Sequence, residues 1–400
     1  MSIPAALARR RNYAGPALFS YGFRPFFLGA AVWSAAAVLL WIPQYFGDLT
    51  LPIAVSPLDW HVHEMVWGYV AATIAGFLLT AIPNWTGRLP VCGAPLVGLA
   101  FLWAAGRLAM LLSGEIGLVP AAVIDVAFLG VLLTVCLREI VAGRNWRNLR
   151  VLVVLALIIA ANVVWHVEIL LFGAADYGNR LGVAAVIGLV TLIGGRIIPS
   201  FTHNWLVRSN PGRLPISFGR FDALCLGVGG VALAAWAIVP TQAAAGMLLL
   251  VAGGLHAWRL ARWAGDRTFA DRLVLVLHAA YLFVPIGFLL VGASVLWPAQ
   301  VPLGAGIHAW TTGAIGLMTL AVMTRATLGH TGRALAASPV TQAIYACLIV
   351  AALARIAAAF GASIALLHLA AFAWLAAFGG FAVVYGPLLL RRPPNWAQGR

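Results

Sequence analysis

The chain contains no lysine and few charged residues of any kind. Only 9% of its 400 residues are charged and 63% are hydrophobic, whereas soluble proteins carry about 25% charged residues. The core of a soluble protein cannot bury such a large share of apolar residues. The composition therefore excludes a soluble globular protein and indicates a chain that crosses a membrane several times.

Cysteine is also scarce. The four cysteines are far apart, each in an apolar setting: Cys92, Cys136, Cys225 and Cys347. No Cys-x-x-Cys pair and no Cys-x-x-Cys-His segment occurs, which excludes paired-cysteine zinc or iron–sulfur sites and covalent attachment of haem through that motif. We expect four buried free thiols.

Long apolar runs are abundant, and a hydrocarbon core of about 30 Å needs about 20 helical residues. The runs are continuous and rich in Ala and Leu, unlike the alternating strands of a membrane barrel. We therefore predict an all-α polytopic membrane protein, a single bundle of about twelve transmembrane helices. The spans are expected at about 25–45, 62–83, 92–113, 118–141, 150–173, 181–199, 221–240, 242–263, 272–295, 303–325, 339–360 and 364–390.

The net charge of +14 comes entirely from arginine. In a twelve-span arrangement the arginine-rich connections fall on one side, while the opposite loops carry Asp48, Asp59, Glu115 and Asp176, with Arg180 as the exception. Basic loops mark the cytoplasmic side, so both termini are predicted to be cytoplasmic. Residues 1–24 then form a cytoplasmic segment, 25–390 one membrane domain and 391–400 a cytoplasmic tail. Because the arginines are dispersed, no nucleic acid partner is expected. No clean internal repeat is evident.

Asp59-Trp60-His61-Val62-His63-Glu64-Met65 is the most informative segment, because it places two imidazoles and a carboxylate where an apolar run begins. Imidazoles are common ligands of transition metals and haem iron. On irregular backbone the two rings of a His-x-His pair face the same way, whereas within a helix they diverge by about 200°. Pro57 lies just upstream and favours an irregular first turn. The pair His61 and His63 is therefore a predicted metal site.

The other histidines fall in two groups along the predicted spans. His166, His308 and His368 join His61 and His63 toward the outer side, and His203, His256, His278 and His330 lie toward the cytoplasmic side. An outer group could thus gather several metal ligands. His203, His256 and His368 are interpreted as ordinary interhelical or interfacial residues.

Two carboxylates and two arginines complete the candidates. Glu64 and Glu168 are placed to orient His63 and His166 or to relay protons, and they are the predicted catalytic groups. Arg196 and Arg325 end two predicted spans, where a guanidinium suits a carboxylate such as a haem propionate. Anchoring of the spans at the membrane boundary is the simpler explanation of these arginines and stays open.

Several segments resemble the NnrS family. They are DWHVHEMVWGYVAATIAGFLLTAIPNWTG (59–87), GGRIIPSFT (194–202), IHAWTTGAIGLMTLAVMTRATLGHTGR (307–333), Asn162 to Glu168 and Leu277 to Tyr281. The resemblance runs over most of the chain. It points to His61, His63, Glu64, His166, His278, His308, Arg325 and His330 as motif positions.

The resemblance implies a twelve-span protein of the bacterial inner membrane that contains haem and copper and is associated with nitric oxide metabolism and nitrosative stress. The haem, expected to be b-type and non-covalent, would be held by residues drawn from His166, His278, His308, His330, Arg196 and Arg325. The metal ligands would be drawn from His61, His63, His166, His278 and His308. Nitric oxide, membrane lipid and an unidentified electron donor are the expected partners, and a redox activity on nitric oxide or iron-nitrosyl species is left open.

Three other functions remain open. A subunit of a haem–copper oxidase or nitric oxide reductase fits the span count, but no segment of the HPEVY type and no adjacent histidine pair occurs. A transporter using intramembrane His and Glu as proton or cation sites fits the span count and the Gly- and Pro-interrupted runs at 194–199 and 285–287. The last alternative is a haem-delivery or anchor protein without chemistry of its own.

Overall fold

The computed structural model describes residues 13–361 and 363–392. Within these residues the chain is helical with no strand, and twelve helices are long and apolar enough to cross a membrane. The predicted all-α polytopic fold is therefore confirmed. The orientation of the termini stays a prediction, and Arg9, Arg10, Arg11 and Arg400 lie outside the described residues.

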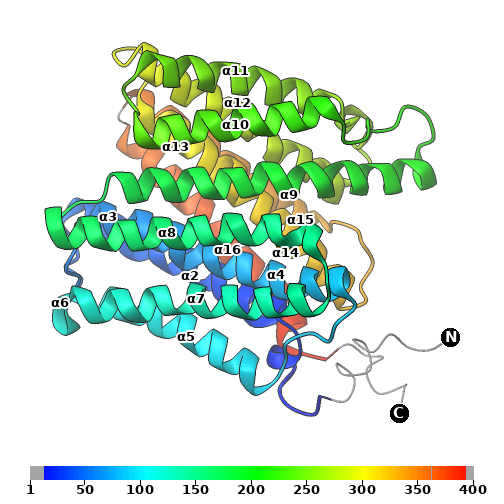
Figure 1. Cartoon of the computed structure of the whole chain (residues 1–400), viewed down its shortest axis with the longest axis horizontal. Helices are drawn as coiled ribbons and strands as arrows, with labels where there is room; N and C mark the ends of the chain where they lie inside the picture. The colour runs from blue at the N-terminus through cyan, green and yellow to red at the C-terminus, as the bar shows by residue number, and fades with distance from the viewer. Residues whose placement is uncertain (1–12, 362, 393–400) are drawn as a thin grey trace. The chain divides into compact units, whose positions relative to one another are not determined.

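The helices follow one another with short connections (Figure 1). The longer elements are α2 (Phe23–Phe46), α3 (Pro57–His63), η2 (Glu64–Val70), α4 (Ala71–Thr86), α5 (Ala94–Leu111), α7 (Leu118–Ala142), α8 (Leu149–Phe172), α9 (Tyr177–Ser209), α10 (Arg220–Ile238), α11 (Ala243–Ala261), α12 (Arg272–Leu296), α13 (Leu303–His308), η5 (Ala309–Gly316), α14 (Leu317–His330), α15 (Pro339–Gly361) and α16 (Ile364–Leu390). Short elements are η1 (Ala17–Ser20), α6 (Ser113–Ile116), η3 (Trp146–Asn148) and η4 (Gly265–Arg267).

The second span begins earlier than predicted, at Pro57 rather than at residue 62. Ser56 caps this helix, because its hydroxyl accepts a hydrogen bond from the Asp59 amide, and Pro57 occupies the first turn, where a missing N–H costs nothing. The sixth span continues to Ser209, well past the end of its apolar run. An apolar window marks where hydropathy falls, whereas helical hydrogen bonding continues into the polar residues beyond it.

The chain divides into two compact units. Of the described residues, unit 1 takes in 13–182, 326–334 and 378–392, and unit 2 takes in 183–325 and 335–377. In unit 1, α4 packs against α2 and α7, and α7 packs against α5 and α8. In unit 2, α10, α11 and α12 lie side by side (Figure 1). The prediction of a single membrane domain stays a prediction.

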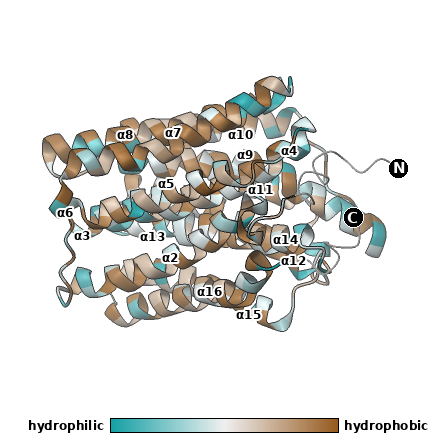
Figure 2. Cartoon of the chain, turned by 90° about the horizontal axis from the view of Figure 1, so that it is seen from below, coloured by the Kyte–Doolittle hydropathy of each residue, from teal (hydrophilic) through white to brown (hydrophobic). Residues whose placement is uncertain are grey.

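Large apolar side chains face outward from many helices. Phe101 and Phe172 are 73% and 77% exposed, for example, and α7 and α8 are coloured as hydrophobic along most of their length (Figure 2). A soluble protein rarely exposes contiguous apolar surface of this extent. These faces suit contact with lipid, as expected for a multi-pass membrane protein.

One turn occurs in both units. The sequence Gly-Arg-Leu-Pro is found at 87–90 and again at 212–215, and both glycines have positive φ, 68° and 141°. In unit 1 the Arg88 guanidinium pairs with Glu139 at 2.6 Å, and in unit 2 Arg213 pairs with Asp266. Each arginine therefore ties the turn that follows a span to the end of a later span.

Spans two and ten each contain a π-helical segment, η2 and η5. A histidine precedes each segment directly, His63 before η2 and His308 before η5. π-helical turns are rare in proteins, but those that occur are often found at functional sites, because the wider turn shifts the side chains that follow it. The two predicted histidines thus occupy equivalent local positions on separate spans.

Candidate functional site

The cap of α3 sets the direction of His61 and His63. Because helical backbone runs through both residues, their rings face different neighbours. The His61 ring stacks on Trp41 of α2 with 4.1 Å between centroids. His63 is fully buried and turns toward α7. The structure therefore brings only His63 to the cluster described next, and a metal site shared by both rings stays a prediction.

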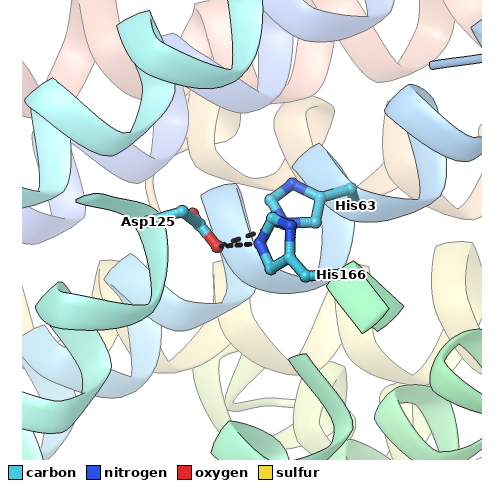
Figure 3. Close-up of side chains that lie close together, drawn as sticks. All are labelled: His63, Asp125 and His166. Atoms are coloured by element: carbon cyan, nitrogen blue, oxygen red, sulfur yellow. Dashed lines mark hydrogen bonds and ion pairs between the residues drawn. The ribbon is translucent and has the colours of Figure 1, made fainter. Parts of the chain in front are cut away.

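His63 belongs to a buried polar cluster in unit 1. Its Nδ1 lies 2.9 Å from Glu64 Oε1, and its Nε2 lies 3.2 Å from Asp125 Oδ2. His166 Nε2 lies 3.1 Å from the same Asp125 oxygen, so two imidazoles converge on one carboxylate (Figure 3). Asn162, one helical turn before His166 on α8, donates its amide to that oxygen at 2.7 Å. These residues and Arg107 are called the unit 1 cluster.

Arg107 of α5 joins the two carboxylates of the cluster. One end of its guanidinium donates to Glu64 Oε2 at 2.6 Å, and the other donates to Asp125 Oδ1. All members of the cluster are at most 5% exposed. With neutral imidazoles the cluster carries two negative charges and one positive charge. A buried site with that imbalance favours an added cation, because an uncompensated charge is costly away from water.

Two glycines make room for the cluster. A Cβ at Gly68, in the π segment η2, would lie 2.7 Å from Glu64 Oε2, 2.8 Å from Trp33 Nε1 and 2.9 Å from Arg107 Nη1. Trp33 donates to Glu64 at 2.6 Å, so the space above Gly68 holds this three-way contact. On α5, a Cβ at Gly106 would lie 3.3 Å from the Asp125 backbone, which lets α5 and α7 approach closely.

The donor set fits a transition metal. One ring nitrogen of His63, one ring nitrogen of His166 and an Asp125 oxygen lie within 4.8 Å of one another. Metal–ligand bonds of about 2.1 Å place neighbouring donors about 3.0–3.4 Å apart, which matches the 3.1 Å and 3.2 Å separations. Glu64 stands behind His63 at Nδ1, in the position from which a carboxylate commonly orients a ligating imidazole.

Glu168, the second predicted catalytic carboxylate, faces the start of α9. Its two oxygens accept the backbone N–H groups of Tyr177 at 2.9 Å and Gly178 at 2.7 Å. These are N–H groups that a helix start leaves without intrahelical partners. The geometry gives Glu168 a capping role, and its role in proton transfer stays a prediction.

Two of the predicted residues of unit 2, His278 and Arg325, contact one turn of α9. His278 Nε2 lies 2.8 Å from the Thr202 hydroxyl, and the Arg325 guanidinium lies 4.1 Å from the centroid of the Phe201 ring. An imidazole and a guanidinium thus approach consecutive residues of one helix. A Cβ at Gly265 would lie 2.5 Å from His278 Nδ1, so only glycine allows this backbone to cover the ring.

The remaining predicted residues lie elsewhere in their units. Arg196 is in α9, about one and a half turns before Phe201. His308 Nδ1 lies 2.7 Å from the Gly304 carbonyl of its own helix. In unit 1, His330 packs against Tyr21 and Phe23, with 5.4 Å between centroids in both cases.

Arg107, Asp125 and Asn162 were not among the site residues predicted from the sequence. A signal was present, because Arg107 and Asp125 are charged residues inside predicted spans 92–113 and 118–141. Charges within membrane spans are rare and mark functional sites by default. Only the charges in the loops were used in the prediction, for the topology, and these two charges within the spans were not considered.

Fold and cluster together define a class: a multi-pass α-helical membrane protein with a buried histidine–carboxylate cluster that suits a metal cation. A sequence model described as NnrS protein matches residues 17–392, nearly the whole chain, and the chain belongs to the NnrS family. It is therefore a nitric-oxide-associated membrane protein, and the resemblance seen in the sequence is confirmed. No curated protein matches the chain.

Proposed function

We propose that the protein binds one copper ion at His63, Asp125 and His166 and uses it in nitric oxide handling and protection from nitrosative stress in the bacterial inner membrane. One observation carries the proposal: two buried imidazoles face one oxygen of Asp125 in a cluster with excess negative charge. Copper bound there would supply one-electron redox chemistry and a binding position for nitric oxide.

The residues of the cluster have distinct tasks in this proposal. Glu64 accepts the Nδ1 proton of His63 and so turns Nε2 toward Asp125. Arg107 holds both carboxylates and limits their mutual repulsion. Since His63 and Glu64 are 2.9 Å apart, a proton can pass between them without backbone movement. Glu64 is accordingly the proposed proton-transfer group.

Aromatic rings separate the cluster from water. The Trp165 ring lies 4.4 Å from the His63 ring between centroids, and Trp67 is fixed by donating to the Ile158 carbonyl at 3.0 Å. Nitric oxide is small and uncharged, so an apolar wall of this kind admits it from the bilayer more easily than it admits ions. The enclosure favours a gaseous ligand over a solvated one.

Haem is the second proposed cofactor. The support is that His278 contacts Thr202 and Arg325 contacts Phe201, two neighbouring residues of α9, since haem takes an imidazole as axial ligand and a guanidinium beside a propionate. A haem band in the absorption spectrum of the purified protein, lost in His278→Ala while the protein still folds, is the expected result. A spectrum unchanged in that variant would remove His278 from the haem site.

Copper titration of purified protein tests the metal site. We expect one copper ion per chain, loss of binding in His63→Ala and His166→Ala, and unchanged binding in His256→Gln, a buried histidine of unit 2. Nitric oxide should alter the spectrum of the copper-loaded protein only when both ligands are present. Full copper binding by the His63→Ala/His166→Ala double variant would overturn the assignment.

A transporter is the alternative, because a buried cluster with excess negative charge also suits a proton or another cation. Proteoliposomes distinguish the two functions. Dissipation of an imposed pH gradient that depends on Glu64 and Asp125, with no copper bound, would favour transport. Proteoliposomes that keep the imposed pH gradient while the protein binds copper would favour the proposed function.

A further inference from the structure

A second buried polar cluster lies in unit 2, formed by Asp222, His256, Arg259 and Tyr281, each at most 3% exposed. Arg259 of α11 donates Nε to Asp222 Oδ1 at 3.0 Å. Its Nη1 donates to the Thr191 carbonyl and to the Tyr281 hydroxyl, both at 3.0 Å. These four residues are called the unit 2 cluster.

The hydrogen bonds of Tyr281 have a defined direction. A guanidinium only donates, so the Tyr281 oxygen accepts from Arg259. Its own O–H is then directed to His256 Nδ1, 2.9 Å away. His256 Nδ1 is accordingly an unprotonated acceptor, and a neutral ring carries its proton on Nε2. Tyr281 is thus a buried phenol hydrogen-bonded to a base.

The pair lies within a chain of buried aromatic rings in unit 2. The His256 ring stacks on Phe288 at 5.2 Å with an 8° angle, Phe288 contacts Trp310 at 5.1 Å, and Trp310 contacts Trp236 at 5.4 Å. On the other side, the Tyr281 ring contacts Trp263 at 4.6 Å. Each ring is at most 1% exposed.

This chain runs from one end of the α10–α11 helix pair to the other. Trp236 lies near the end of α10, and Trp263 lies just past the end of α11. A four-residue connection, 239–242, joins these packed helices, so their chain ends lie at opposite ends of the pair. A helix of 19 residues is about 28 Å long. The rings therefore cover most of the distance across a hydrocarbon core of about 30 Å.

Three glycines allow the backbone to approach Arg259 and the buried rings closely. A Cβ would lie 2.2 Å from Arg259 at Gly195, 2.8 Å from His256 Nε2 at Gly229, and 2.1 Å from Trp310 at Gly287. The Gly194-Gly195-Arg196 segment is explained in this way, because Gly195 lets Arg259 cross α9. At these three positions the backbone packs directly on the side chains, so the cluster suits transfer of charge rather than binding.

We propose that Tyr281 is a redox-active tyrosine that gives one electron to a neutral nitrogen-oxide radical, nitrogen dioxide. The Tyr281 O–H bond breaks, its proton forms an N–H bond at His256 Nδ1, and nitrogen dioxide becomes nitrite. The oxidised phenol is a neutral tyrosyl radical, and the neighbouring tryptophans can carry the electron from Tyr281 to nitrogen dioxide. The choice of oxidant rests on the proposed function in nitric oxide handling, whereas the chemistry of the Tyr281–His256 pair does not.

Pulse radiolysis of nitrate in the presence of the purified full-length protein tests this step, since it generates nitrogen dioxide. Freeze-quenched samples are examined by electron paramagnetic resonance. Wild type should give a tyrosyl signal that Tyr281→Phe loses. Tyr345→Phe, which removes another buried tyrosine hydroxyl, should keep the signal. A signal unchanged in Tyr281→Phe, or one centred on tryptophan alone, overturns the proposal.

The His256→Gln variant tests whether His256 accepts the Tyr281 proton or only a hydrogen bond. An amide oxygen still accepts the Tyr281 hydroxyl, but it does not take the proton. Radical formation should slow by about 100-fold, the lower range for loss of a positioned base, and the solvent deuterium isotope effect of wild type should change. An unchanged rate and isotope effect would overturn the role of His256. Copper titration of the same variants reports on the unit 1 cluster separately, so failure of either proposal is distinguishable.

Discussion

Both units bury a cluster of charged side chains, but the two clusters differ in charge balance. The unit 1 cluster holds Glu64 and Asp125 against one guanidinium, Arg107. In unit 2, Asp222 faces two guanidinium groups, since Arg262 also reaches it at 3.3 Å. Excess negative charge with two converging imidazoles suits a metal cation. In unit 2 Asp222 balances Arg259, and the part-exposed Arg262 adds positive charge that disfavours a metal cation. The histidine there contacts a phenol instead.

The comparison shows that buried histidines acquire their chemistry from the charges around them. His63 and His256 are both at most 1% exposed. A carboxylate stands on each side of His63, whereas His256 has the Tyr281 hydroxyl at one nitrogen and Gly229 close to the other. The same side chain therefore suits metal binding in one unit and proton acceptance in the other.

The largest expected difference between the units comes from removing one carboxylate in each. Asp125→Asn should lower copper affinity by more than about 100-fold, beyond the loss expected for a supporting residue. Asp222→Asn should leave copper binding unchanged but destabilise the fold by about 3–5 kcal/mol, because Arg259 stays buried without its carboxylate. Copper titration and unfolding in detergent micelles measure both effects.

Asp125→Asn should destabilise the fold less than Asp222→Asn, since Arg107 keeps Glu64 as a partner and the remaining charges balance. If the two variants lose equal stability and neither affects copper, the difference in charge balance has no functional meaning.

Glycine substitutions give a smaller effect of the same kind. In Gly68→Ala the new Cβ would lie 2.7 Å from Glu64 Oε2, so Glu64 must shift and His63 loses its orientation. We expect copper affinity to fall by about 10- to 100-fold, as for other groups that support a ligand. Gly229→Ala, which crowds His256, is the matched control and should leave copper affinity at the wild-type value. A larger copper loss in Gly229→Ala would contradict the assignment of the site to unit 1.

The sequence predicted the fold well because apolar runs report directly on membrane spans. All twelve spans were found, although the start of the second and the ends of the sixth and tenth were misplaced, since helical hydrogen bonding does not stop where hydropathy falls. Of the site, His63, Glu64 and His166 were predicted. Asp125 was not, because its meeting with His63 and His166 depends on the packing of three helices that sequence spacing does not reveal.

His61 shows most clearly that a prediction from spacing depends on the local backbone. His-x-His spacing suits one metal only on irregular backbone, and the Ser56 cap with Pro57 starts a regular helix instead. We expect His61→Ala to change copper affinity by less than about tenfold, below the range for supporting groups. The stack on Trp41 is lost, so a small drop in thermal stability should accompany it. An affinity loss as large as that of His63→Ala would restore His61 as a ligand.

Glu168 gives the smallest expected effect and separates capping from catalysis. Glu168→Leu removes both acceptors of the Tyr177 and Gly178 N–H groups and should cost about 0.5–2 kcal/mol, the range for a lost helix cap. Glu168→Gln keeps an oxygen acceptor at the positive end of α9 and should cost less, although it loses the favourable charge. Neither variant should alter copper binding, because the cap is separate from the hydrogen bonds of the unit 1 cluster. If Glu168→Gln keeps wild-type stability and copper but abolishes the response of the loaded protein to nitric oxide, Glu168 moves a proton as the sequence suggested, and the cap is only its resting position.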